Sequence, residues 1–149
     1  MSDPIWQAGR FQLNLHHPIV MGIVNVTPDS FSDGGLHGNT QSAMAHCEKL
    51  LQDGAQILDI GGESSRPGAP ELTADEEWSR IGELVRDAIK LNVPISIDTY
   101  KPETMAKALD LGADIINDIR AFQEPGALEV VAQSQSCGIC AMHMQGKPD

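Results

Sequence analysis

The sequence predicts an α/β protein built on a parallel β-sheet. Short, almost continuously apolar runs alternate with amphipathic stretches along its 149 residues. Such runs are typical of parallel strands covered on both faces, which are joined by right-handed helical crossovers. Residues 53–60 (DGAQILDI) and 111–118 (LGADIIND) also repeat one design, in which a helix end and Gly-Ala lead into a buried strand. We therefore expect one domain of repeated strand–helix units over residues 1–149.

Five strands are expected in this sheet. Each is a short apolar run that ends on or beside a polar residue. They cover residues 19–26, 56–60, 95–98, 115–119 and 139–143. Residues 11–15 alternate with period two and predict a short lead-in strand before the first unit.

Helices are expected between the strands. The first spans residues 40–53, where apolar side chains share one face. Thr73 and Glu76 form a capping-box pattern at the start of the second, and Pro102 suits the first position of the third. The fourth is predicted over residues 126–135.

Two architectures fit this order of elements. One is an open, five-stranded, doubly wound sheet, and the other is the first five strands of an eight-stranded barrel. Chain length favours the open sheet, and the periodicity of the sequence does not distinguish the two.

Composition and charge restrict the class of function. No apolar run approaches membrane-spanning length, and the N-terminus lacks the layout of a signal peptide, so we expect a cytoplasmic protein without membrane contacts. A net charge of −11 disfavours nucleic-acid binding, which needs Lys and Arg to neutralise phosphates. Three cysteines make a disulfide framework unexpected.

Polar side chains gather where the predicted strands end. These residues are Asn25, Asp59, Asp98, Asn117, Asp118 and His143. Single Asp or Asn residues often begin turns or cap helices, but their presence at five successive strands favours a ligand site. In both candidate architectures, ligands bind at the carboxyl ends of the strands.

Two long links carry further chemistry. Residues 27–39 follow the first strand and contain DSFSDGG, and residues 61–72 follow the second and contain ESSRPG. Links of this length are uncommon in a compact domain and are usually functional. Gly and Pro suit a loop that folds over a ligand, and Arg66 offers a fork for phosphate or carboxylate.

Four segments occur in a fixed order: NVTPDSFSDGG from Asn25, DIGGESSRPGA from Asp59, SIDTYKP from Ser96 and INDI from Ile116. Together they resemble the successive signatures of the dihydropteroate synthase family. That resemblance covers essentially the whole chain. It implies a (β/α)8 TIM barrel, of which roughly the first five strands are present.

The resemblance also implies a reaction. In this family, the amine of p-aminobenzoate displaces pyrophosphate from 6-hydroxymethyl-7,8-dihydropterin pyrophosphate, giving dihydropteroate for folate synthesis. Sulfonamides resemble the aminobenzoate and compete for its place. The family resemblance further implies Mg²⁺ as cofactor and a homodimer of the full-length protein.

Site residues follow from the positions that match the family's motifs. Asp98 and Asn117 would bind the pterin, with Ile119 and Met142 as apolar neighbours of its ring. Asn25 would ligate Mg²⁺, whose other positions the diphosphate and water would fill.

The two loops would provide the second substrate site. Asp33 and Arg66 are the implied catalytic residues, Arg66 stabilising the departing diphosphate and Asp33 the cation at the pterin methylene. Phe31, Ser65, Arg66 and Pro67 would shape the aminobenzoate site.

The family's later strands supply further pterin and phosphate ligands and the dimer interface, which these residues do not include. We therefore expect the chain alone to be an incomplete enzyme. Two alternatives remain: a pterin-binding module without pyrophosphate chemistry, and a non-catalytic half-barrel that assembles with a partner. The PDSFSDGG and SSRPG segments favour the synthase over the binding module.

Cys137, Cys140 and His143 have a spacing that suggests a zinc site. On a strand, Cys140 would point to the opposite face from the other two. We therefore expect these cysteines to pack as small buried residues.

Overall fold

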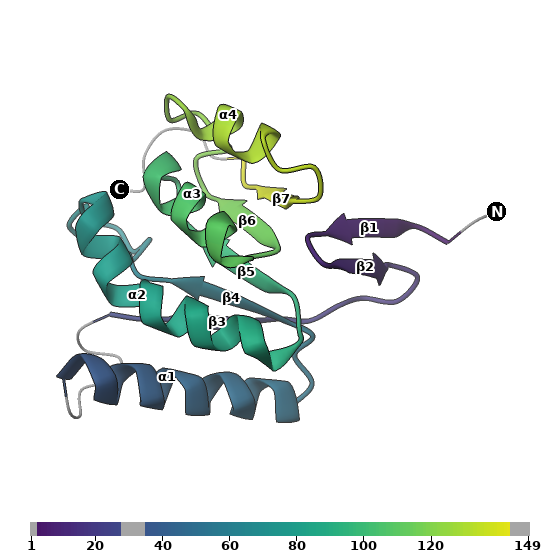
Figure 1. The fold of residues 1–149 in the computed structure, drawn as a ribbon, viewed down its shortest axis with the longest axis horizontal. Coiled ribbons are helices and arrows are strands. Elements are labelled where there is room, and N and C mark those ends of the chain that lie inside the picture. The colour runs from purple at the N-terminus through teal and green to yellow at the C-terminus, as the bar shows by residue number, and fades with distance from the viewer. Residues whose placement is uncertain (1–2, 28–34, 144–149) are drawn as a thin grey trace.

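The computed structural model describes residues 3–27 and 35–143 (Figure 1). Phe31 and Asp33, both expected in the site, lie outside the described residues. Among the helices described, none is long and apolar enough to cross a membrane.

Five parallel strands form the central sheet, in the order β3-β4-β5-β6-β7. Their bounds are Met21–Asn25, Ile57–Gly61, Ile95–Asp98, Ile115–Asp118 and Gly138–Ala141. Because each strand lies beside the next one in sequence, right-handed crossovers put every connecting helix on the same face. This winding is that of a barrel, and it rules out the doubly wound sheet, whose strand order reverses at a switch point.

In the described part of the chain, four α-helices follow one another around this face: α1 (Gly35–Gln52), α2 (Ala74–Ala88), α3 (Pro102–Leu111) and α4 (Ala127–Ala132). Each packs against its neighbour in sequence (Figure 1). A 3₁₀ turn, η1 (Ile89–Leu91), continues α2. Side chains from α1, α2, α3 and α4 close over the helix-facing strand residues Val24, Leu58, Ile60, Ile95, Ile97 and Ile116, each of which is 0% exposed.

The expected helix starts are confirmed for α2 and α3. The Thr73 hydroxyl accepts from the Glu76 N–H, and the Glu76 carboxylate accepts from the Thr73 N–H, both at 3.1 Å. Pro102 is the first residue of α3. The expected bounds were less accurate elsewhere, because α1 begins at Gly35 rather than residue 40 and α4 ends at Ala132 rather than residue 135.

The fifth strand was also placed too far along the chain. β7 covers Gly138–Ala141, so Met142 and His143 lie beyond it. The strand stops pairing here because its partner β6 ends at Asp118, whose carbonyl accepts the Met142 N–H at 3.1 Å.

A β-hairpin precedes the sheet where the sequence predicted one short strand. β1 (Ile5–Ala8) pairs antiparallel with β2 (Phe11–Asn14). The hairpin packs against the amino ends of the central strands, where Ala8, Ile57 and Ile115 form a small apolar cluster. Gly138 is required there, because a Cβ at this position would lie 2.9 Å from the Trp6 ring.

One buried carboxylate fixes the hairpin to the sheet. Asp114, which is 0% exposed, accepts from the Arg10 N–H at 3.0 Å, from Arg10 Nε at 3.0 Å and from Arg10 Nη2 at 2.9 Å. It also accepts from the Ile95 N–H at 2.9 Å. A single side chain therefore joins the hairpin, β5 and the entry to β6.

Replacing this carboxylate should destabilise the fold. Asp114→Ala leaves the Ile95 N–H and the Arg10 guanidinium without their partner, and we expect it to lower the free energy of unfolding by about 3 kcal/mol. Urea denaturation measures the change. Asp110→Ala, at an exposed position on α3, is the matched control and should change it by less than about 0.5 kcal/mol. Equal midpoints for the two variants would contradict this role of Asp114.

Candidate functional site

Strand register brings the predicted polar residues into one row at the carboxyl end of the sheet. Asn25 pairs with Gly61, Gly61 with Asp98, Asp98 with Asn117, and Asn117 with Cys140. Residues paired in this way point to the same face, here the face away from the helices. Gly61 leaves room for its neighbour, because a Cβ there would lie 3.2 Å from the Asp98 Cβ.

A second polar layer supports this row. Asp59 lies two residues before Gly61 on the same face and is 2% exposed. Its carboxylate accepts from the Ser96 hydroxyl at 2.7 Å and from the Asn117 amide at 3.2 Å. Because the Asn117 Nδ2 group donates to Asp59, its Oδ1 carbonyl is the atom left to accept from a ligand.

Burial and neighbouring charge alter the protonation of Asp98. Burial raises its pKa to about 7, and the negative charges of Asp59, Glu77, Asp118 and Glu63 act in the same direction. Burial also raises the pKa of Asp59, while its two hydrogen bonds oppose this. Near neutral pH, Asp98 can therefore present either an acceptor carboxylate or a carboxyl group that donates.

A cleft of about 470 Å³ opens over this row. It is lined by Asn25, Thr27, Asp98 and the start of the loop after β4, Glu63, Ser64, Ser65 and Arg66. Four of the predicted site residues, Asn25, Ser65, Arg66 and Asp98, are thus brought together.

Three other predicted residues of the described chain, Ile119, Pro67 and Met142, do not line this cleft. Ile119 lines a smaller cavity of about 100 Å³ that also contacts Ser65 and Arg66 and lies beside Tyr100 and Arg120. Pro67 is exposed on the loop after β4. Met142 is 45% exposed beyond β7. Their expected contacts with substrate stay predictions.

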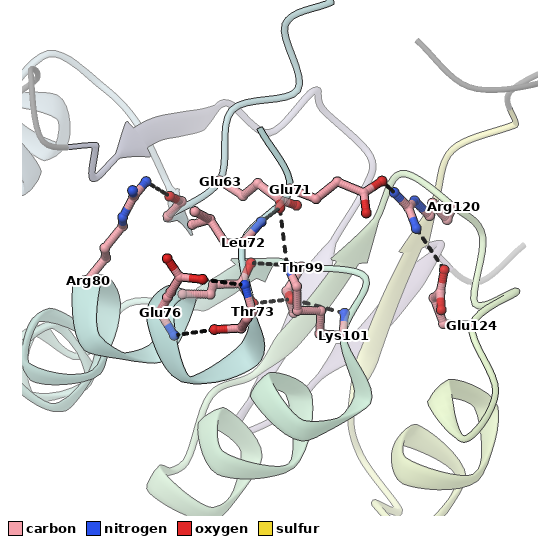
Figure 2. A network of polar contacts seen from close by, with 12 residues as sticks. Glu63, Glu71, Leu72, Thr73, Glu76, Arg80, Thr99, Lys101, Arg120 and Glu124 are labelled. Carbon is pink, nitrogen blue, oxygen red and sulfur yellow. Dashed lines mark hydrogen bonds and ion pairs between the residues drawn. The ribbon is translucent and has the colours of Figure 1, made fainter. Parts of the chain in front are cut away.

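A polar network lies beneath the loop after β4 (Figure 2). Lys101 Nζ lies 3.3 Å from Glu63 Oε1 and 3.7 Å from Glu77 Oε2. Glu77, on α2, also accepts from the Thr99 hydroxyl at 2.7 Å, and that hydroxyl accepts from the Lys101 N–H at 3.1 Å. The network therefore joins the loop, α2 and the turn after β5.

Tyr100 is buried beside two cations at the edge of this network. The Lys101 ammonium lies 4.3 Å from its ring centroid, and the Arg120 guanidinium lies 3.7 Å from it. Arg120 also pairs with Glu71 at 2.9 Å and with Glu124 at 2.7 Å. Burial, followed by its hydrogen bond to Glu63, raises the pKa of the Tyr100 hydroxyl.

Asp59, Tyr100, Lys101 and Arg120 had no predicted role in the site. In the sequence, Asp59 stands out only as a polar residue near a strand end. Strand parity offered a signal for it, since Asp59 and Gly61 point the same way. The two cationic residues also had a signal in the sequence. Lys101 comes three residues after Asp98, and Arg120 comes three residues after Asn117.

Within residues 3–27 and 35–143, no group of three His, Cys, Asp or Glu side chains is arranged to hold a metal. Cys137 and Cys140 are free thiols, half-buried, and burial raises the pKa of both. His143 is exposed beyond the strand.

The signature of the pterin binding enzyme family matches residues 21–149. The chain belongs to this family. It is 53% identical over 150 residues to the dihydropteroate synthase of Neisseria meningitidis serogroup C, covering 99% of this chain and 53% of that protein. It is 51% identical over 137 residues to that of Escherichia coli strain K12, covering 91% and 48% respectively.

Solved structures of dihydropteroate synthases also match this chain in fold and sequence. A Xanthomonas albilineans dihydropteroate synthase with 4-aminobenzoic acid matches with a TM-score of 0.90 and 45% identity, over 97% of this chain and 53% of that one. A Burkholderia cenocepacia dihydropteroate synthase complexed with 7,8-dihydropteroate matches with a TM-score of 0.85 and 47% identity, over 98% and 48%. The chain thus spans about half the length of these relatives, and the expected partial (β/α)8 barrel is confirmed.

The titration of Asp98 in this half-barrel can be measured directly. NMR of the side-chain carboxyl carbon should give a midpoint near pH 7, the value to which burial raises its pKa. Asp59→Asn removes one neighbouring charge and should lower that midpoint. A midpoint near the ordinary value of about 4 would contradict the burial of Asp98 beside Asp59.

The same shift has a consequence for stability. Because the pKa of Asp98 is raised in the folded chain, the native state binds more protons than the unfolded state between pH about 4 and pH about 7. The contribution of Asp98 to stability therefore falls as pH rises through this range. Asp98→Asn should flatten the dependence of urea midpoint on pH, and an unchanged slope would contradict the shift.

Proposed function

We propose that this chain carries the amino-terminal half of a dihydropteroate synthase site. In the proposed reaction, the amine nitrogen of p-aminobenzoate forms a bond to the methylene carbon of 6-hydroxymethyl-7,8-dihydropterin pyrophosphate. The C–O bond to the diphosphate breaks, and the amine loses a proton to solvent. The observation that carries the proposal is the convergence of Asp98, Asn117 and the Ser65–Arg66 segment at one end of the sheet.

The strand-end row supports binding of the pterin. Asp98 offers a carboxyl group and Asn117 a carbonyl oxygen, which suit the amino and ring N–H groups along the pterin edge. Ile119 and Met142 are proposed as apolar neighbours of the ring. The Burkholderia cenocepacia relative, named above, is complexed with 7,8-dihydropteroate, the product of this reaction.

The loop after β4 supports binding of the second substrate. Ser65 and Arg66 line the cleft together with Asp98, and Pro67 and Phe31 are proposed to complete the aminobenzoate site. The Xanthomonas albilineans relative holds 4-aminobenzoic acid, and a Yersinia pestis relative was solved with a sulfonamide drug. We propose the same place for both ligand classes in this chain.

Electrostatics would supply most of the catalysis. Arg66 has an exposed guanidinium at the cleft and is proposed to stabilise charge on the departing diphosphate. Asp33 is proposed to stabilise the cation that develops at the pterin methylene. An aniline nitrogen attacks as the neutral amine, so the site needs no strong general base.

Magnesium fits the residues present. Asn25 is exposed at the end of β3 and lines the cleft with Asp98. An amide oxygen suits Mg²⁺, which takes one or two protein ligands and fills its other positions with water and substrate oxygens. When bound, the ion would neutralise charge on the diphosphate leaving group.

We also propose, from the family resemblance, that the protein is a cytoplasmic homodimer. The acidic net charge of −11 supports partners other than nucleic acid.

A chimera tests the reaction. This chain would be joined to the part of the Neisseria meningitidis serogroup C protein that it does not match, and dihydropteroate formation would be assayed. We expect activity, and Asp98→Asn should lower kcat/KM about 100-fold, or about 2.7 kcal/mol, because a contact to the pterin is lost. Asp110→Asn is the matched control and should leave it unchanged. A chimera that binds the pterin but never consumes the pyrophosphate would identify a binding module instead.

A further inference from the structure

We propose that Glu63 is a positioning residue, which holds the loop between β4 and α2 in place over the cleft through its pairing with Lys101. The inference deepens the proposed function, on which it rests, by assigning the placement of Ser65 and Arg66 to a residue in the loop's base. In this role, Glu63 sets the position of the loop and does not contact the reacting atoms.

The first contact closes the loop on itself. Glu63 lies at the start of the loop, and its Oε1 atom accepts from the N–H of Leu72 at the loop's other end. Leu72 is buried, and Thr73 directly after it caps α2. The side chain of Glu63 therefore fixes the distance between the two ends of the segment that carries Ser65 and Arg66.

The second contact ties the closed loop to β5. Lys101 lies three residues after Asp98, and its ammonium reaches Glu63 Oε1 at 3.3 Å. Both side chains are only 11% exposed. Tyr100, from the same turn, lines the small cavity beside Glu63. The loop base is thus held by the turn that follows the Asp98 strand end (Figure 2).

Charge balance makes Lys101 essential to this arrangement. Glu77 is 1% exposed and lies 3.7 Å from the same ammonium. Without Lys101, two carboxylates would remain close together in a poorly solvated place, where unpaired charge is costly. The Glu63 carboxylate would then be driven towards water, and its contact with Leu72 would be lost.

Two further ties confine the effect of Glu63 to the loop. Arg80 Nη1 on α2 donates to the Gly62 carbonyl at 2.8 Å, and Glu71 pairs with Arg120 at 2.9 Å. These contacts hold the flanks of the loop, while Ser65 and Arg66 are exposed between them. Loss of Glu63 should therefore displace the exposed segment without unfolding the sheet.

The direct test is amide hydrogen exchange on the chain itself. In Glu63→Ala, the Leu72 and Ala69 amides should exchange about tenfold faster, while the Leu58 and Asp114 amides of the sheet keep their rates. Glu63→Gln keeps an oxygen that can accept from Leu72 and should restore much of the protection. Lys101→Met should behave like Glu63→Ala, and Lys101→Arg like the unchanged chain.

Kinetics of the chimera separate positioning from a merely structural role. Glu63→Ala should raise the KM for p-aminobenzoate about tenfold and lower kcat, because the displaced segment carries Ser65 and Arg66. The KM for the pterin pyrophosphate should stay within about twofold, because Asp98 and Asn117 on the strands are proposed to bind its pterin. Glu129→Gln, on the exposed face of α4, is the matched control for Glu63→Gln and should change neither KM.

Several results would overturn the proposal. Unchanged exchange at Leu72 would show that Glu63 does not hold the loop. Faster exchange throughout the sheet would show that it serves the whole fold. Equal rises in both KM values would show a direct role in binding the pyrophosphate substrate. An inactive chimera would count against the proposed function alone, since hydrogen exchange still decides whether Glu63 positions the loop.

Discussion

The in-register pairing of five parallel strands is the constraint on which the site depends. Register alone places Asn25, Gly61, Asp98 and Asn117 in one row, although they come from four different parts of the chain. A shift of one residue in any strand would turn its polar side chain towards the apolar helix face. The fully buried residues Val24, Ile60, Ile97 and Ile116 oppose such a shift, because it would expose them. Apolar packing on the helix face of the sheet thus fixes the strand register, and with it the positions of the polar side chains on the other face.

The buried carboxylates near the strand ends have two different kinds of partner. On the sheet, Asp59 is buried with neutral partners, Ser96 and Asn117, so burial raises its pKa and that of Asp98. Beneath the loop after β4, Glu63 and Glu77 share the cation of Lys101 instead. The first arrangement leaves acceptor groups available to a ligand with N–H donors. The second uses its carboxylates to hold a loop, whose exposed segment, with Ser65 and Arg66, lines the cleft.

Much of the fold could be predicted from local patterns. Apolar runs located the five strands, and the capping box at Thr73 and the proline at the start of α3 located the starts of two helices to the residue. The choice between barrel and open sheet depended on strand order, which short-range patterns do not encode. Asn25, Asp98 and Asn117 were found because they stand where apolar runs end and match motifs of the family. Lys101 and Arg120 were not, since their roles arise from contacts with Glu63 and Glu71, far away in sequence.

Most of the proposed function depends on Asp98 and Asn117, at the strand ends, accepting hydrogen bonds from the N–H groups of the pterin. A crystal structure of the chimera with 6-hydroxymethyl-7,8-dihydropterin tests it most directly. The account predicts the pterin's N–H groups within hydrogen-bond distance of the Asp98 carboxyl and the Asn117 Oδ1 atom, with Asn117 Nδ2 still donating to Asp59. A pterin bound elsewhere, for example in the groove between α1 and α2 beside Met44 and Glu83, would contradict it.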